Sequence, residues 1–182
     1  MSTAYISHPD CHAHDTGQEH PECASRLSAI EDNLLQSGLS DFLINVDAPE
    51  VTEEQLLRAH TAAHIASMKA SIPFQGYARL DPDTVICPQS LQAAKRAAGA
   101  AVHAVDMIMD GRVQNAFCAV RPPGHHAETD RALGFCMFNN LAVGVKHALE
   151  YHGINRVAVI DFDVHQGNGT EDILIGDDRV LY

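Results

Sequence analysis

The feature of this sequence that most constrains its fold is an apolar run that ends in a polar cluster. Residues 156–160 read RVAVI, and residues 161–169 read DFDVHQGNG. A short β-branched run bounded by polar residues is typical of a buried parallel strand. If the strand continues, side-chain alternation predicts that Asp161, Asp163 and His165 project to one side. Two carboxylates and an imidazole gathered there are costly to bury without a cation.

The carboxyl end of a strand in an open α/β sheet is also where ligands bind. Gly167 and Gly169 allow a tight backbone turn just after the cluster. A solvated acidic loop is the alternative interpretation. The turn favours an ordered binding site over a solvated loop. The segment therefore predicts half of a metal centre.

A second polar cluster follows another short apolar run. Residues 116–120 read AFCAV, and residues 121–127 read RPPGHHA. The two prolines fix φ and the glycine allows a sharp turn, so His125 and His126 leave the strand end on a stiff loop. Adjacent histidines alone are weak evidence. If both runs lie in one sheet, however, the two clusters meet at the same edge.

Strand and helix signals alternate along the chain. Leucine and isoleucine spacing with Gly38 at its end predicts a helix over residues 24–36, and Thr52 with Gln55 resembles a capping box that opens a helix over 53–59. Further helices are expected over residues 61–70, 90–110, 140–152 and 170–175, and strands over 4–7 and 179–182. This order predicts an α/β protein with a parallel sheet and helices on both faces.

These motifs together resemble the histone deacetylase family, above all RPPGHH at residues 121–126 and DFDVH at 161–165. Weaker matches run along nearly the whole chain: residues 8–10, 20–22 with 26–27, 80–84, 134–136 and 138–140. The pair Asn168-Gly169 is closer to the class II and bacterial branches, because the class I branch carries an aspartate at that position.

The resemblance implies an arginase/deacetylase-like three-layer α/β/α fold with a mainly parallel sheet, present only in part. Residues 1–182 are expected to be the N-terminal part of a single deacetylase domain, with no separate second domain. In the family a third zinc ligand, an aspartate, and an oxyanion-stabilising tyrosine lie further downstream. Tyr182 is no substitute, since it lies within an expected strand. The apolar edge at that strand is expected to drive homo-oligomerisation or aggregation unless a C-terminal half covers it.

The resemblance also implies a catalytic Zn²⁺. Asp163 and His165 would be two of its three protein ligands, leaving an open position. Backbone carbonyls around these residues and Asp161 would bind a structural K⁺.

The paired histidines and their partners would do the proton chemistry. His126 would act as the general base on a metal-activated water and deliver the proton to the leaving amine. His125 would be its electrostatic partner, with Asp161 hydrogen-bonded to it. Asn168 would lie behind His126, without the negative charge of an aspartate.

Four further residues would surround the substrate. Gly134 and Phe135 would line a narrow channel for the acylated amine. Asp83 would hold the substrate backbone at the rim, and Arg26 would lie in the inner channel beneath the metal.

The expected reaction is hydrolysis of the acetyl amide of an acylated amine, either acetyl-lysine in a protein or peptide, or an acetylpolyamine. This chain by itself is expected to be inactive, because the site is incomplete. A catalytically incomplete binding or scaffold fragment is one alternative. An arginase-like ureohydrolase is another, but its second metal needs aspartates where this chain has Gln166, Gly167 and Asn168.

Amino-acid composition limits the kinds of molecule that this chain is expected to bind. With 24 acidic against 12 basic residues, the formal charge of −12 disfavours nucleic acid and anionic membranes and favours cationic substrates. Five scattered cysteines show no metal spacing, and no signal peptide opens the chain. The longest apolar stretch, residues 97–109, is interrupted by His103 and Asp106, so we expect a cytoplasmic protein with no membrane span.

The remaining histidines are expected to have structural roles. His60 and His64 are one helical turn apart and are assigned to a helix surface. Those on the later helices, His103, His147 and His152, are expected to face solvent. A loop that contains Cys11, His12, His14 and His20 is expected to form a pocket rim.

Overall fold

The structure, a computed structural model, describes residues 2–182. Its elements in chain order are β1 (Thr3–Ser7), α1 (Pro9–Ala13), α2 (Ser25–Gln36), the 3₁₀ turn η1 (Leu39–Phe42), β2 (Leu43–Asp47), α3 (Glu53–Leu56), α4 (Ala62–Ser71), β3 (Ala78–Arg79), β4 (Val85–Ile86), α5 (Ser90–Met109), β5 (Asn115–Cys118), α6 (Asn140–Glu150), β6 (Val157–Ala158), α7 (Asn168–Leu174) and β7 (Val180–Leu181). The predicted alternation of strands and helices is confirmed.

Helix ends follow the sequence signals. Gly38 and Gly111 adopt the left-handed conformation just after α2 and α5, with φ of 70° and 69°. The Thr52–Gln55 capping box is present, with both reciprocal hydrogen bonds formed. The helix that it opens is shorter than the predicted 53–59, because tight turns after Leu56 carry the chain inward toward His60.

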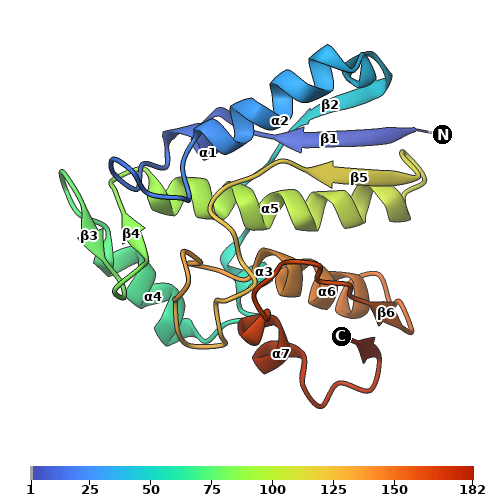
Figure 1. The fold of residues 1–182 in the computed structure, drawn as a ribbon. Helices are drawn as coiled ribbons and strands as arrows, with labels where there is room; N and C mark the ends of the chain where they lie inside the picture. The colour runs from blue at the N-terminus through green and yellow to red at the C-terminus, as the bar shows by residue number, and fades with distance from the viewer. Residues whose placement is uncertain (1) are drawn as a thin grey trace.

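The first three parallel strands form a sheet in the order β2-β1-β5. The crossover from β1 to β2 runs in the opposite direction along the sheet from the crossover between β2 and β5. Because such crossovers are right-handed, α2 and α5 cover opposite faces, as Figure 1 shows.

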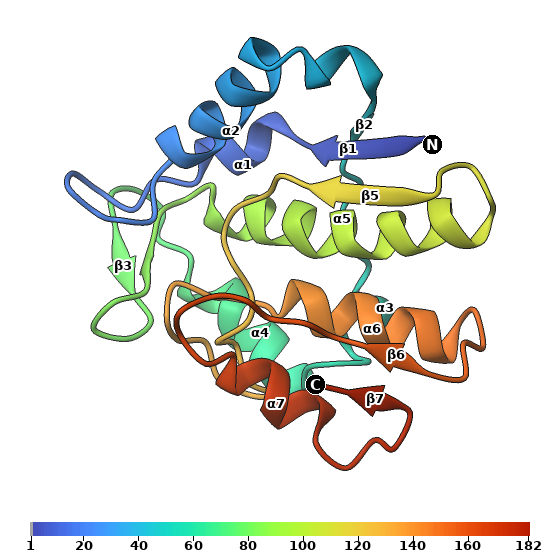
Figure 2. The ribbon, with the colours of Figure 1, turned by 45° about the vertical axis from the view of Figure 1, so that its right-hand side comes forward.

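The condition that both apolar runs lie in one sheet is not met within residues 2–182. Strand β6 pairs only with β7, in a separate two-stranded parallel sheet. Figures 1 and 2 show β5 and β6 apart, each beside one of the packed helices α5 and α6. The expected strand 156–160 is therefore only two residues long, and Ile160 is exposed.

An apolar groove separates the two sheets. It has a volume of about 500 Å³, and its lining comes from β5, β6 and the facing sides of α5 and α6. Its floor is made mainly of small side chains, among them Ala101, Ala104 and Ala148. The groove leaves one edge each of β5 and β6 without a strand partner among residues 2–182.

The core lies mainly between α4, α5 and α6, where Ile65, Ala98 and Val143 are buried together with Phe138. Two helical glycines lie at close contacts, and only one of them leaves no room for a methyl group. A Cβ on Gly99 would collide with backbone atoms of Pro49 and Val51, whereas one on Gly144 would lie 3.2 Å from the Ala101 methyl group. No helix among residues 2–182 combines the length and apolarity that crossing a membrane requires.

We predict that Gly99→Ala lowers the free energy of unfolding by about 2–4 kcal/mol, because rigid backbone must move to admit the methyl group. Gly144→Ala is the matched control, since its nearest contact would be 3.2 Å instead of a collision with backbone atoms, and alanine has the higher helix propensity. Urea unfolding at pH 7 measures both variants. Equal losses would contradict this account of the α5 packing.

Candidate functional site

The two polar clusters meet even though their strands do not pair. The ring of His125 donates from Nδ1 to Asp161 Oδ2 at 2.8 Å, and His126 Nδ1 lies 2.6 Å from Asn168 Oδ1. The backbone N–H of Thr170 also donates to the His125 carbonyl at 3.0 Å. Side-chain and loop hydrogen bonds therefore join the loop after β5 to the loop and helix after β6.

Small residues allow this close approach. A Cβ on Gly167 would lie 2.5 Å from Asp161 Oδ2, and one on Gly169 would meet the backbone of His126 and Ala127 at similarly short range. Gly169 thus has a second role beyond the predicted turn, because it admits the partner loop, whereas Gly167 makes room for the Asp161 carboxylate.

The expected metal ligands lie beside these histidines. Asp163 Oδ1 accepts from the backbone N–H of His165 at 2.8 Å and lies 3.1 Å from its Nδ1. The His165 ring packs edge-on near His126, with 6.0 Å between centroids. A hollow of about 680 Å³, whose lining includes Asp161, Asp163 and His165, opens beside them.

The two carboxylates keep their charge. Burial opposes ionisation of Asp161, but hydrogen bonds from His125 and the Asp163 backbone outweigh it and lower its pKa below the ordinary value. The backbone N–H of His165 lowers the pKa of Asp163. A carboxylate and an imidazole suit Zn²⁺ in kind, but residues 2–182 bring together only two of the three protein ligands that a catalytic zinc site uses.

The segment that carries these ligands does not continue the strand. It leaves the β6–β7 pairing after Val159 and bends at residues 163–165, and Ile160, Phe162 and Val164 are almost fully exposed. Polar and apolar side chains still alternate along it, as the sequence indicates. The apolar members have no neighbouring element to pack against in the described part of the chain.

The expected channel residues lie close to His126. Gly134 has φ of +57°, and a Cβ there would lie 2.5 Å from the His126 ring. Phe135 also has a positive φ, and its ring packs edge-on against His20. The Asp83 carbonyl accepts from the same His20 side chain, so these residues form one rim.

Arg26 lies on α2, 3.7 Å from Glu22. Its side chain is 57% exposed, so no inner channel closes around it within residues 2–182.

A buried ion pair anchors the loop that carries the paired histidines. Arg121 makes a bidentate contact with Glu22, at 2.5 and 2.8 Å, and His14 approaches the same carboxylate at 3.4 Å. Burial opposes the charge on Glu22, but hydrogen bonds from His14 and Arg121 outweigh it and lower its pKa to about 2. Spacing could not reveal this pair, since 99 residues separate its members.

The prediction that His60 and His64 lie on a helix surface is wrong, because both are buried. His64 Nε2 bonds the Met137 carbonyl, and His60 bonds the backbone of Glu128 and Asn139. Both rings therefore hold residues 128–139 against α4. Burial and the neighbouring His64 lower the pKa of His60 to about 4, so it stays neutral.

His147 is likewise buried rather than exposed to solvent. Its Nε2 and that of His152 both lie within 2.7 Å of Asp106 Oδ1, forming a three-residue group of metal-ligand type. Arg58 donates to His147 Nδ1 at 2.6 Å, which leaves the proton on Nε2, where a metal would bind. The group therefore functions as a hydrogen-bond network.

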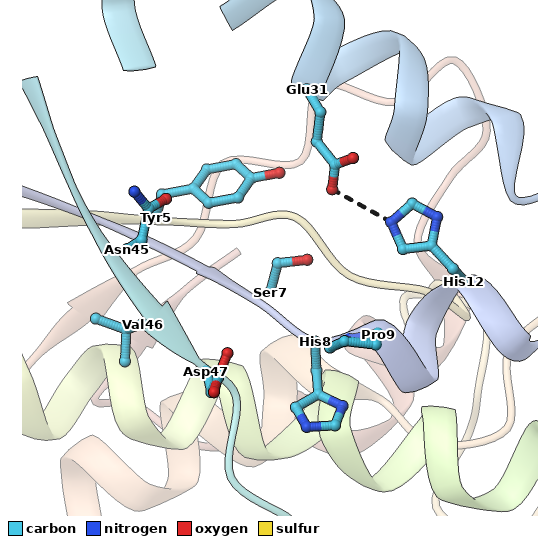
Figure 3. A pocket seen from close by; sticks show the side chains of 9 residues that line it. All are labelled: Tyr5, Ser7, His8, Pro9, His12, Glu31, Asn45, Val46 and Asp47. Carbon is cyan, nitrogen blue, oxygen red and sulfur yellow. Dashed lines mark hydrogen bonds and ion pairs between the residues drawn. The ribbon is translucent and has the colours of Figure 1, made fainter. Parts of the chain in front are cut away.

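A separate hollow lies over β1 and β2 beneath α2. Figure 3 shows its lining, in which His12 pairs with Glu31 at 3.2 Å. The hydroxyl of Tyr5 is buried at its base without a hydrogen-bond partner among residues 2–182. None of the expected catalytic or metal-binding residues lines this hollow.

Comparisons with known proteins agree with one another. A family model described as the histone deacetylase domain matches residues 20–182. A histone deacetylase-like amidohydrolase of Pseudomonas aeruginosa is 42% identical over 163 residues, which cover 90% of this chain and 42% of the relative. Human polyamine deacetylase HDAC10 is 35% identical over 100% of this chain and 29% of its own length.

The crystal structure of the HDA15 HD domain matches with a TM-score of 0.94 at 36% identity, covering 100% of this chain and 52% of that one. The chain thus spans less than two thirds of the length of each of these proteins.

We predict that Glu22→Gln lowers the free energy of unfolding at pH 7 by about 3–5 kcal/mol, because Arg121 is left buried without a counter-charge. The pKa of Glu22 is lower in the folded than in the unfolded chain, so its stabilisation is complete above about pH 4.5 and shrinks as the pH falls toward 2. The difference in the free energy of unfolding between wild type and Glu22→Gln should therefore shrink below pH 4.5, as denaturant titrations would measure.

Glu31→Gln, which removes the partner of the half-exposed His12, is the control and should cost less than about 1 kcal/mol. A difference in unfolding free energy between wild type and Glu22→Gln that stays constant down to pH 3 would contradict the proposed origin of the stabilisation.

Proposed function

Because the chain belongs to the histone deacetylase family, we propose that it is the N-terminal part of a single deacetylase domain, which hydrolyses the acetyl amide of an acylated amine. The observation that carries the proposal is the meeting of the paired histidines with Asp161 and Asn168, next to Asp163 and His165. These side chains are of the kinds that amide hydrolysis uses for proton transfer and metal binding.

In this proposal His126 acts as general base and then as general acid. It takes a proton from the attacking water and delivers it to the leaving amine. Asn168 orients its ring, and His125 with Asp161 provides a second polarised imidazole beside it. A histidine suits both proton transfers because its ordinary pKa lies near neutral pH.

Asp163 and His165 would hold Zn²⁺ together with a ligand from outside residues 2–182. When bound, zinc supplies a Lewis acid that polarises the amide carbonyl and lowers the pKa of water. Backbone carbonyls around the same residues would hold a structural K⁺, as the resemblance implies.

Gly134 and Phe135 would line the channel, because their backbone runs directly beside the His126 ring. Asp83 would bind the substrate backbone at the rim, and Arg26 would lie in the inner channel once further chain covers it. The acidic surface, with a formal charge of −12, suits a cationic substrate such as an acetylated lysine tail or an acetylpolyamine.

The apolar groove supports the view that these residues work with additional polypeptide. Two unpaired parallel edges face it, and Ile160, Phe162 and Val164 are exposed near its end. Strands that filled the groove would pair both edges and bury these side chains. A catalytically incomplete scaffold is the alternative. An arginase-like ureohydrolase is disfavoured, because Gln166 and Gly167 stand where a second metal would need carboxylates.

We predict that residues 1–182 alone do not hydrolyse a fluorogenic acetyl-lysine peptide. A fusion in which the unmatched C-terminal part of the Pseudomonas relative follows Tyr182 should do so in a zinc-dependent manner. In this fusion His126→Ala should lower kcat by about 10²–10⁴-fold, the range for loss of a general base. His12→Ala, outside the site, should leave kcat unchanged.

Zinc content by elemental analysis accompanies each assay. Full turnover by the 182-residue chain would disprove the proposed incompleteness. A folded fusion that binds zinc and yet hydrolyses neither acetyl-lysine peptide nor acetylpolyamine would disprove the enzymatic function and favour a scaffold.

A further inference from the structure

Asn168 has a second partner behind the histidine. Its Nδ2 donates to Glu128 Oε1 at 2.9 Å while its Oδ1 faces His126 Nδ1 at 2.6 Å. The three side chains form one hydrogen-bonded line, His126–Asn168–Glu128. The carboxylate at its far end comes from the same loop as the histidine, two residues further along the chain.

The orientation of an asparagine amide decides what its neighbour can do. With the oxygen toward the ring, Asn168 accepts a hydrogen bond from the N–H at His126 Nδ1. With the amide reversed, its NH₂ group would face Nδ1 and its oxygen would face Glu128. An ionised carboxylate has only acceptor atoms, so the reversed amide would set two acceptors against each other. Glu128 therefore selects the first orientation.

The selected orientation fixes the tautomer of the neutral imidazole. A proton held on His126 Nδ1 by Asn168 leaves the lone pair on Nε2. The opposite tautomer would carry its proton on Nε2 and could accept none there. The position of one amide thus determines whether His126 can act as a base.

Glu128 is held well enough to perform this selection. Its backbone N–H donates to the Arg131 carbonyl at 2.9 Å, and its carbonyl lies 2.9 Å from His60 Nδ1. The next residue, Thr129, donates from its backbone N–H and its hydroxyl to Asp172, at 2.9 and 2.7 Å. Asp172 and Asn168 both lie on α7. The bonds from Thr129 to Asp172 and from Asn168 to Glu128 therefore fix the loop that carries Glu128 to this helix.

We propose that Glu128 is a positioning residue for the base: it orients the Asn168 amide and thereby keeps the proton of His126 on Nδ1. The consequence for catalysis rests on the proposed function. The tautomer itself is a property of residues 1–182 and can be measured without any turnover.

Long-range ¹H–¹⁵N spectra of the histidine rings in the 182-residue chain test the proposal directly. In the wild-type chain, His126 should show a protonated Nδ1 and a lone pair on Nε2. Glu128→Gln replaces an acceptor by a group that can also donate, so the amide loses its preferred orientation and the His126 signals should move toward the other tautomer. Glu171→Gln is the charge-matched control. Glu171 lies on α7, as Asn168 does, but it bonds Gln166, so this variant should leave the His126 signals unchanged.

Asn168→Asp provides the rescue. Both oxygens of the new carboxylate accept, so His126 Nδ1 finds an acceptor whichever way the group turns. Adding Glu128→Gln to this variant also removes the repulsion between two facing carboxylates, and it should leave the proton on His126 Nδ1, whereas in the wild-type background Glu128→Gln moves the ring toward the other tautomer. The signals of His64 and His147, both buried elsewhere, report whether each variant remains folded.

Unchanged His126 signals in folded Glu128→Gln would overturn the proposal, as would an equal shift in the Asn168→Asp background. In the active fusion, Glu128→Gln should lower kcat at least about tenfold with little change in KM, and Asn168→Asp should suppress this loss. A tautomer that responds in a fusion without turnover would leave this inference standing and remove the proposed function alone.

Discussion

The packing of α5 against α6 holds the described chain together, because it is the main link between the two parallel sheets, which share no hydrogen bond within residues 2–182. The contact is close since small residues meet across it, with Gly144 set against Ala101. One helix precedes the loop that carries the paired histidines, and the other leads into the segment that carries Asp163 and His165. Within residues 2–182 the two halves of the candidate site are therefore placed by this helix packing and by the hydrogen bonds between their loops, without pairing of β5 and β6.

Much of the fold could be predicted from local signals. Glycines in the left-handed region end α2 and α5, and the Thr52–Gln55 box opens α3, because such features depend on residues a few positions apart. The strand at residues 156–160 was only partly predictable. A strand needs a neighbour, and β7 pairs with this run only as far as Val159, so strong β propensity gave only a two-residue strand.

The candidate site also has parts that local sequence predicts and parts that only tertiary contacts determine. Its two clusters could be found because each follows an apolar run, a pattern visible within a dozen residues. The residues that hold them in place could not. Glu22, Glu128 and His60 are separated in sequence from the groups they fix, and nothing near them in the chain marks them as buried or paired. A histidine at helical spacing is usually on the surface, and only tertiary contact turns His60 inward.

The contact between Gly134 and the His126 ring limits how this architecture can diverge. A side chain at residue 134 would collide with the His126 ring, so under the proposed function the channel wall and the general base are constrained together. Substitution of Gly134 by a larger residue is therefore disfavoured. If the channel is as proposed, selectivity for longer or bulkier acyl groups has to evolve at Phe135 or the Asp83 rim. A designer who wishes to change the substrate while keeping the chemistry would begin at those two positions.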